Sequence, residues 1–255
     1  MTVYEIHAYF EKLFPPQTAA DWDNDGLCCC PDGSRPVRRV LVALDPTRGA
    51  VDRAVSGGFD LLLTHHPLLF HPLTALTGER TVPAKLLTLA QAGVSALCCH
   101  TRLDAAAGGV NDVLADLLGV RDAVPFGPAG EIACGRVGTL CAPVEASDFA
   151  RFVKARLNAP FVRLVGEGKV SKIALLGGEG GDFVEAAKAI GADLFLSGRI
   201  GYHRMLDGAE EGMAMIEAGH YATEFPVTEH LCRLLRQADP AIETAIYATD
   251  VIGTV

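Results

Sequence analysis

Two adjacent histidines, His65 and His66, directly follow the apolar run Leu61–Leu63 and precede Pro67. Three consecutive leucines predict a strand that is buried on both faces, as in a parallel sheet. Pro67 removes a backbone donor and biases His66 toward an extended conformation. Because neighbouring side chains of an extended chain point to opposite faces, each imidazole could serve a different ion. The pair therefore indicates a dinuclear metal site, with two partly exposed histidines at a strand end as the alternative.

Two further apolar strands are followed by residues that commonly bind metals. One strand runs into His100 and Asp104, and the other runs into His220 and Glu224. Open α/β sheets place their functional sites at the carboxyl ends of strands. Histidine combined with carboxylate, without a thiolate, suits zinc, manganese, iron, nickel or cobalt. Three such strand ends favour a metal site over scattered surface histidines.

The rest of the chain alternates between strand and helix patterns, which predicts an α/β fold with mainly parallel or mixed sheets. The predicted strands are Val40–Leu44, Leu61–Leu63, Val94–Cys99, Val137–Cys141, Phe161–Val165, Ile173–Leu176, Leu194–Leu196 and Gly212–Ala218; the predicted helices cover residues 3–13, 49–56, 82–92, 110–118, 147–157, 181–190, 203–211 and a last stretch from about Val227. Residues 121–135 are rich in proline and glycine and form the best internal boundary. We therefore expect a first lobe of residues 1–125 plus 220–255 and a second lobe of residues 126–219, with the metal site between them.

The two lobes show an internal similarity. Placing Val40 on Ile173 superimposes residues 40–64 on residues 173–197 without a gap, including an aspartate before each second strand. Part of such a match can come from the alternation common to all α/β folds. The positions of His65–His66 are held by Gly198–Arg199 in the second lobe. The metal chemistry is therefore expected to be asymmetric, with the histidine pair in the first lobe only.

The bulk composition narrows the classes of protein and partner. The chain has 255 residues, is 49% hydrophobic and carries a formal net charge of −9. An acidic balance argues against nucleic acid or an anionic membrane as the main partner. The amino terminus lacks the basic start and apolar core of a signal peptide, and no apolar run approaches the roughly 18 residues of a spanning helix. We expect a cytoplasmic protein.

The eight cysteines do not form a recognisable metal or redox motif. No Cys-x-x-Cys spacing occurs, which excludes a zinc ribbon or a thioredoxin-like motif. In a cytosolic chain such cysteines are most simply reduced core residues. A soft-metal role for the triplet Cys28–Cys30 is the alternative.

Several of these segments together resemble a known family. Thr64–Pro67, His100–Asp104 and Gly219–Glu224 resemble the signatures of the YbgI-like dinuclear-metal-centre proteins, which are also called GTP cyclohydrolase 1 type 2 homologues. The acidic, turn-rich segment Asp21–Leu27, which could hold a cation or be a solvated loop, is similar to the amino-terminal motif of that family. Val40–Asp45 matches its first core strand. The resemblance covers nearly the whole chain. The length of the chain resembles that of the short form of the family.

The resemblance implies a ligand set and an assembly. Two divalent transition-metal ions would be held by His65, His66, Asp104, His220 and Glu224. The carboxylates of Asp104 and Glu224 would bridge the ions, because imidazole nitrogens rarely bridge. The family's short form implies a ring-shaped homohexamer built from dimers.

Three arginines depart from the family pattern. Arg102 stands where the family usually has asparagine, and Arg199 and Arg204 stand where it often has acids. They could bind a phosphate or carboxylate group of a small-molecule substrate through bidentate contacts, or they could have retuned or removed an ancestral activity. His100 and His203 could orient ligands or act as general acids, with a purely structural role as the alternative.

Two functions follow from the proposed ligands. The first is a metal-dependent hydrolase in which two ions activate a bound water; the resemblance implies the opening of the purine ring of GTP as its reaction. The second is a metal-binding regulatory or metal-handling protein without turnover. Fold and ligands do not select a substrate.

Overall fold

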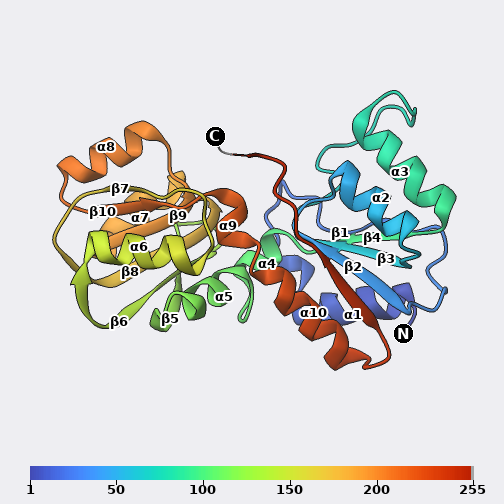
Figure 1. Cartoon of the computed structure of the whole chain (residues 1–255), viewed down its shortest axis with the longest axis horizontal. Coiled ribbons are helices and arrows are strands. Elements are labelled where there is room, and N and C mark those ends of the chain that lie inside the picture. The colour runs from blue at the N-terminus through green and yellow to red at the C-terminus, as the bar shows by residue number, and fades with distance from the viewer. Residues whose placement is uncertain (254–255) are drawn as a thin grey trace. The chain divides into compact units, whose positions relative to one another are not determined.

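A computed structural model of the chain describes residues 1–253. Within these residues the chain forms two α/β units, each with its own sheet (Figure 1). Unit 1 comprises Met1–Leu103 and Thr228–Thr249, and unit 2 comprises Asp104–Val227 with the tail from Asp250. Helices alternate with strands in both units, and the sheet is mainly parallel in unit 1 and mixed in unit 2, so the predicted fold class is confirmed.

The sheet of unit 1 places the histidine-bearing strand at its centre. Its strand order is β1 (Gly26–Cys29), β4 (Ser95–Cys98), β3 (Leu61–Thr64), β2 (Arg39–Ala43) and β11 (Glu243–Tyr247). All neighbours are parallel except β1, which is antiparallel to β4. Helices α2 (Arg48–Ser56) and α3 (Thr81–Ala92) cover one face, and α1 (Val3–Leu13) and α10 (Val227–Ala238) cover the other (Figure 1). The short helices η1 (Pro16–Thr18) and α4 (Thr101–Ala105) lie in the connecting loops. Every residue of β3 is buried, as expected for a strand with parallel neighbours and helices on both faces.

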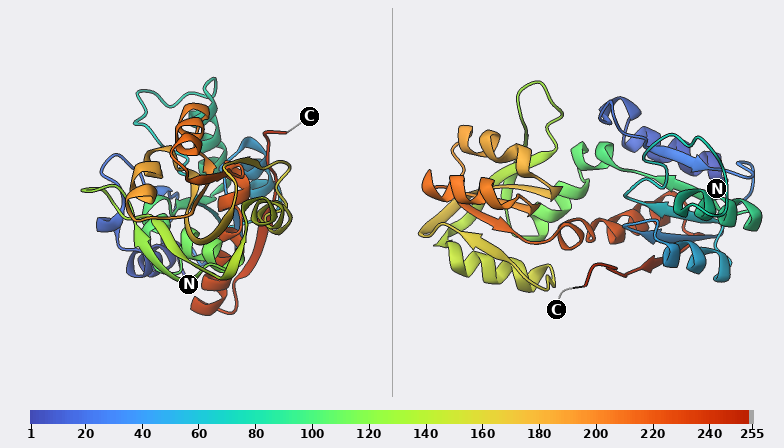
Figure 2. Two further views of the ribbon diagram at one scale, coloured as in Figure 1. Left: turned by 90° about the vertical axis from the view of Figure 1, so that its left-hand side faces the viewer. Right: turned by 90° about the horizontal axis from the view of Figure 1, so that it is seen from above.

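The sheet of unit 2 combines parallel and antiparallel strands. Its order is β5 (Arg121–Phe126), β6 (Gly135–Glu145), β8 (Lys169–Glu179), β9 (Leu194–Arg199), β10 (Ala214–Glu217) and β7 (Arg163–Val165). Strands β8, β9 and β10 are parallel to one another. Helices α5 (Val110–Leu117) and α6 (Ala146–Arg156) cover one face, and α7 (Val184–Ala189) and α8 (Tyr202–Glu210) cover the other (Figure 2). The short helices η2 (Gly181–Phe183) and α9 (His220–Glu224) complete the unit.

Residues of β8 alternate between two hydrophobic cores. Ile173 and Leu175 pack with α5 and α6, whereas Ala174 and Leu176 pack with α7 and α8. Successive side chains of a strand point to opposite faces, so a strand that is apolar at every position must be covered on both sides. The continuous apolar run of β8 therefore dictates helices on both faces of the sheet.

The internal similarity of the sequence is also a similarity of strand register. In unit 1 Val40 of β2 pairs with Leu61 of β3, and in unit 2 Ile173 of β8 pairs with Leu194 of β9. These are the residues that the ungapped superposition places on one another. Because a one-residue slip would turn every side chain to the other face, a shared register is a stringent match.

Each repeat has the same hydrogen-bonded aspartate directly before its second strand. The carboxylate of Asp60 accepts from the backbone N–H groups of residues 38 and 39, at 2.9 and 3.0 Å. The carboxylate of Asp193 accepts from residues 171 and 172, at 2.9 and 2.8 Å. Each aspartate thus joins the entry of one parallel strand to the entry of the next.

The units divide at other residues than the sequence pattern suggests. Residues 104–125 group with unit 2, because α5 packs on β8 and the side chain of Asn111 accepts from the backbone N–H of Gly177 at 2.7 Å. The proline- and glycine-rich segment 121–135 begins with β5, which pairs with β6. Residues 220–227 also group with unit 2, because α9 packs on β8 and β9.

The helices in residues 1–253 are at most 12 residues long. A bilayer crossing needs about 20 predominantly apolar residues. Accordingly, no helix in the described part of the chain is long and apolar enough to span a membrane.

All eight cysteines are free thiols; Cys98 and Cys99 are buried, and Cys28 and Cys29 are partly buried against the core of unit 1. The Cys28 thiol donates to the carbonyl of Ala96, and the Cys98 thiol donates to the carbonyl of Gly26, both at 3.5 Å. Burial raises the pKa of Cys28 to about 12. Because the thiolate is the metal-binding form, this protonated thiol favours the interpretation as a core residue over a soft-metal site.

Candidate metal centre

His65 and His66 continue the line of β3 beyond its last assigned residue. The backbone N–H of His65 donates to the carbonyl of Ala43 at 3.3 Å, and that of His66 donates to the carbonyl of Leu44 at 3.0 Å. The His65 side chain is fully buried, and the His66 side chain is 21% exposed. Pairing with the neighbouring strand therefore fixes the backbone from which both imidazoles extend, up to Pro67.

Each of these two rings is held through its Nδ1 atom. Nδ1 of His65 lies 2.9 Å from the carbonyl oxygen of Cys99, and Nδ1 of His66 lies 2.7 Å from Oδ1 of Asp45. A carbonyl oxygen can only accept, so His65 carries its proton on Nδ1 in this arrangement. Histidines that bind metals typically donate their second N–H in this way, which fixes the tautomer and the ring orientation. The metal ligand offered by either ring would then be Nε2.

His100 is held by two aspartates of the acidic segment at residues 21–27. Its Nδ1 lies 2.8 Å from Oδ1 of Asp23, and its backbone N–H donates to Asp25 at 2.8 Å. Oδ2 of Asp23 accepts from the backbone N–H and the hydroxyl of Thr101 at 3.1 and 2.6 Å. The two buried carboxylates of this segment therefore support the loop that follows β4.

The three histidines of unit 1 form a compact group. His65, His66 and His100 each offer a ring nitrogen within 4.8 Å of the other two, and their ring centroids lie 4.8 to 5.5 Å apart. Three imidazole nitrogens without a thiolate fit zinc, iron, nickel or cobalt. This spacing suits one ion that all three rings hold. It also suits two ions, each held by a different ring or rings of the three.

The electrostatics of Asp23 give a pH-dependent contribution to stability. Burial would raise the pKa of Asp23, but hydrogen bonds from His100 and Thr101 outweigh burial and lower it to about 2. A carboxylate with a lowered folded-state pKa stabilises the fold above its ordinary pKa of 3.8, and this stabilisation is lost as the pH falls toward 2.

We therefore expect Asp23→Asn to lower the free energy of unfolding of the metal-free protein by about 1–2 kcal/mol at pH 6. The difference from the parent protein should shrink as the pH falls from about 5 toward 3. Urea unfolding in the presence of a chelator measures both values. A difference that stays constant over this range would show that the Asp23 charge does not support the fold.

Unit 2 supplies a second pair of ligand-type residues on α9. Nε2 of His220 lies 3.0 Å from Oε2 of Glu224, one helical turn later. The Glu224 side chain is 6% exposed and the His220 side chain 46% exposed. The hydroxyl of Thr223 accepts from the backbone N–H of Gly178 at 3.1 Å, which ties α9 to the end of β8.

Two glycines explain why α9 can lie at the strand ends of unit 2. A side chain at Gly178, whose φ is +70°, would overlap Glu224, and one at Gly198 would overlap the backbone of His220. In the internal repeat, Gly178 corresponds to Asp45 and Gly198 corresponds to the first histidine of the pair. Unit 2 thus uses the equivalent space for a helix where unit 1 places an aspartate and a histidine.

Asp104 lies on α4, where the chain passes from unit 1 to unit 2. Its backbone carbonyl accepts from the side-chain amide of Asn111 at 3.2 Å, and the residue is half-buried. Its backbone is therefore tied to α5 of unit 2.

Arg102 is placed in the interior of unit 1. Its side chain is 2% exposed; Nε donates to Oδ1 of Asp25 at 3.0 Å and Nη1 donates to the carbonyl of Phe14 at 3.2 Å. A buried guanidinium paired with a carboxylate is costly to separate. Arg102 therefore supports the His100 loop from behind, and its contact with a substrate stays a prediction.

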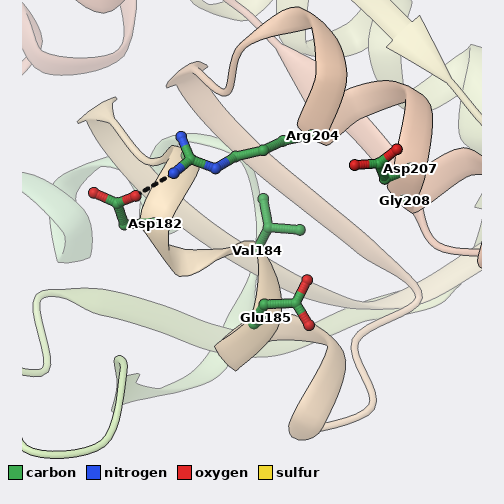
Figure 3. Close-up of a pocket in the computed structure, with 7 residues that line it drawn as sticks. Asp182, Val184, Glu185, Arg204, Asp207 and Gly208 are labelled. Carbon is green, nitrogen blue, oxygen red and sulfur yellow. Dashed lines mark hydrogen bonds and ion pairs between the residues drawn. The ribbon is translucent and has the colours of Figure 1, made fainter.

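The other two arginines and His203 lie in unit 2. Arg199 is 70% exposed and lies 3.4 Å from Glu179. Arg204 on α8 is paired with Asp182 across a shallow pocket that also contains Glu185 (Figure 3). His203 is exposed, and its ring packs against Tyr202. Both arginine charges are therefore partly neutralised by carboxylates of their own unit.

Residues 1–252 match the family model for Duf34/NIF3 (NGG1p interacting factor 3). The chain belongs to the Duf34/NIF3 family. This Duf34/NIF3 protein is 31% identical over 232 residues to the GTP cyclohydrolase 1 type 2 homolog of Clostridium perfringens, covering 89% of this chain and 88% of the relative. It is 34% identical over 235 residues to the homolog of the same name from Streptomyces coelicolor, covering 88% and 82%. The predicted family resemblance is confirmed.

Solved structures agree with this placement. A hypothetical protein of Staphylococcus aureus is 25% identical to this Duf34/NIF3 protein and superimposes with a TM-score of 0.88, covering 100% and 99% of the two chains. The protein ybgI, of unknown function, is 22% identical with a TM-score of 0.85, covering 98% and 99%. Both share the two-sheet α/β fold described above.

Two residues of the centre in this Duf34/NIF3 protein were absent from the sequence-based set of site residues. Asp45 and Asp23 hold the rings of His66 and His100, although 21 and 77 positions separate the partners. The role of Asp45 could have been predicted from the sequence, because Asp45 is a polar residue after the buried strand β2. The histidines follow the neighbouring strand β3 at the same edge of the sheet. The sequence does not single out Asp23 in this way, because Asp23 is one of several acids in the same loop.

Proposed function

We propose that this Duf34/NIF3 protein is a metal-dependent hydrolase with two divalent transition-metal ions per chain, of zinc, iron, manganese, nickel or cobalt. The proposed ligands are His65, His66, Asp104, His220 and Glu224, with the two carboxylates as bridges. The observation that carries the proposal is the orientation of the two adjacent imidazoles, whose Nδ1 atoms are both held by oxygen acceptors. The buried carboxylate of Glu224 beside an imidazole supports it.

When bound, two such ions would supply Lewis acidity and lower the pKa of a coordinated water to about 7. The chain's own part is to hold the ligands in place and to move a proton. His100 is the better placed of the two candidates for the proton, because its ring centroid lies 5.3 and 5.5 Å from those of His65 and His66. His203, the other candidate, is an exposed residue of α8. The name of the relatives, GTP cyclohydrolase 1 type 2 homolog, suggests a nucleotide or another phosphate-bearing small molecule as substrate.

One observation favours a second function, a metal-binding regulatory or metal-handling protein without turnover. The guanidinium of Arg102 is buried and ion-paired with Asp25, which offsets the charge that the change from the family's usual asparagine adds.

Elemental analysis of the purified protein tests both functions. We expect close to two transition-metal ions per chain, and no bound metal even after metal soaking would contradict both functions. A panel of nucleotides and phosphoesters then separates them. Hydrolysis that is abolished by His66→Ala or Glu224→Gln, in variants that keep the circular dichroism of the parent, supports the hydrolase. Retained metal without hydrolysis supports metal handling.

We further propose that the protein is a homohexamer in the cytoplasm, by resemblance to the short form of the family. Light scattering coupled to size-exclusion chromatography should give a mass near six times the 26.9 kDa of one chain. A monomer at micromolar concentration would contradict this proposal.

A further inference from the structure

Two large aromatic side chains are exposed beside the three-histidine group of unit 1. Trp22 is 64% exposed and Phe70 is 43% exposed. Their ring centroids lie 5.9 Å apart, with an interplanar angle of 52°. The rings are therefore in contact but not stacked face to face, and each retains area that water reaches. Exposed aromatic rings in contact are costly to hydrate and commonly mark a binding surface.

The aromatic pair is positioned by the loops that hold the metal-binding histidines. His100 makes T-shaped contacts with both rings, with centroid distances of 6.2 Å to Trp22 and 6.4 Å to Phe70 and an interplanar angle of 74° in each case. The side-chain amide of Asn24 donates to the backbone carbonyl of Leu69, which joins the two loops that carry the pair. The two rings are thus held in place before any ligand arrives, which lowers the cost of binding.

We propose that Trp22 and Phe70 bind the planar heteroaromatic ring of the substrate, such as a nucleobase, while the reacting part of the same molecule lies at the histidines. This inference rests on the proposed function and adds the chemical class of the substrate. Aromatic side chains bind bases of any sequence through their π faces, and each stacked base contributes substantially to affinity. The ring of His71, which lies 4.9 Å from Phe70, is exposed and can hydrogen-bond to the polar edge of a heteroaromatic ring.

A protein partner or a second copy of the chain is the competing occupant. The loop beyond Phe70 also exposes Leu73 and Leu76, at 37% and 56%. The contact of both aromatic rings with His100 favours a small substrate, because a stable protein interface would have to cover about 800 Å² on each partner and would close over the histidines. The experiment below distinguishes these occupants.

Trp22 is the only tryptophan of the chain, so its fluorescence reports directly on this surface. Guanosine 5′-monophosphate is titrated into the zinc-loaded protein, with ribose 5-phosphate as the matched compound that lacks the ring. We expect saturable quenching by the nucleotide only. Phe70→Ala should weaken this binding about 5- to 150-fold, the effect of one lost stacking partner, and Phe70→Tyr should restore it. Phe152→Ala, which removes an equally exposed phenylalanine (45%) from α6, should leave the binding constant unchanged.

Calorimetric titration extends the test to variants of Trp22, which have no tryptophan fluorescence to follow. Trp22→Phe should retain nucleotide binding, and Trp22→Ala should weaken it as Phe70→Ala does. Equal responses to nucleotide and ribose 5-phosphate, or affinity unchanged in both alanine variants, would overturn the proposal. So would a change of oligomeric mass in Phe70→Ala, which would identify the pair as a protein interface.

The same titration on chelator-treated protein separates this inference from the proposed function. Nucleotide quenching that persists without metal, in a protein that fails to hydrolyse, would leave the aromatic ring site standing while the hydrolase fails. Two bound ions per chain with no nucleotide quenching would leave the proposed function standing while the aromatic ring site fails.

Discussion

Replacement of His65 by alanine is expected to weaken metal binding by at least about 100-fold, more than is typical for the loss of a residue that only supports a ligand. His65 is fully buried, and its Nδ1 is held by the carbonyl of Cys99, so no solvent-exposed group can take its place. Elemental analysis after dialysis against a metal buffer, followed by competition with a chromophoric chelator, measures the effect.

His230→Ala is the matched control for this experiment. His230 lies on α10 in the same unit and interacts with Arg233 at the surface. Its replacement should leave both the metal content and the affinity unchanged. Full metal occupancy in His65→Ala, with the affinity of the parent, would remove this residue from the ligand set.

Replacement of Arg102 by glutamine should cost about 3–5 kcal/mol of unfolding free energy, because it leaves a buried carboxylate without its cation. The side chains of Arg102 and Asp25 are only 2% and 5% exposed. Burial already raises the pKa of Asp25 in spite of the neighbouring guanidinium. The backbone N–H of His100 donates to the same carboxylate, so the loop after β4 that contains His100 should loosen as well.

Urea unfolding of Arg102→Gln and of Arg48→Gln compares a buried pair with an exposed one. Nε of Arg48 lies 2.9 Å from Oδ1 of Asp52, and both side chains are more than half exposed. Loss of such a surface pair should cost no more than about 1 kcal/mol. Similar small losses for both variants would show that Arg102 is not needed to hold the interior, and would reopen its role as a substrate contact.

The main elements of the fold could be predicted from local patterns. Apolar runs such as that of β3 and the helical spacing in residues 3–13 coincide with strands and helices of the structure. The short elements β1, α4 and α9 lie outside the predicted strands and helices. Each has five residues or fewer, so no period can be recognised, and α9 is preceded by Gly219, whose φ is +92°.

The residues that hold the histidines illustrate the limit for the site. His65 and His66 are predictable because adjacent ligand-type residues follow a strand end. Asp23 and the pairing of Arg102 with Asp25 are not, because both depend on a loop about 77 positions away in the chain. A loop of several acids is consistent with solvent, a cation or buried partners, and only tertiary contact selects among them.

The division of the chain into units has a consequence for its synthesis. Unit 1 includes Thr228–Thr249, so β11, the parallel neighbour of β2, is synthesised only after the whole of Asp104–Val227. The segment Asp104–Val227 carries all six strands of the second sheet in one continuous stretch. Unit 2 can therefore fold while the chain is still being made, whereas the first sheet must wait for residues Thr228–Thr249. Until then the amino-terminal half holds an unpaired edge at β2, a surface that a nascent-chain chaperone would need to protect.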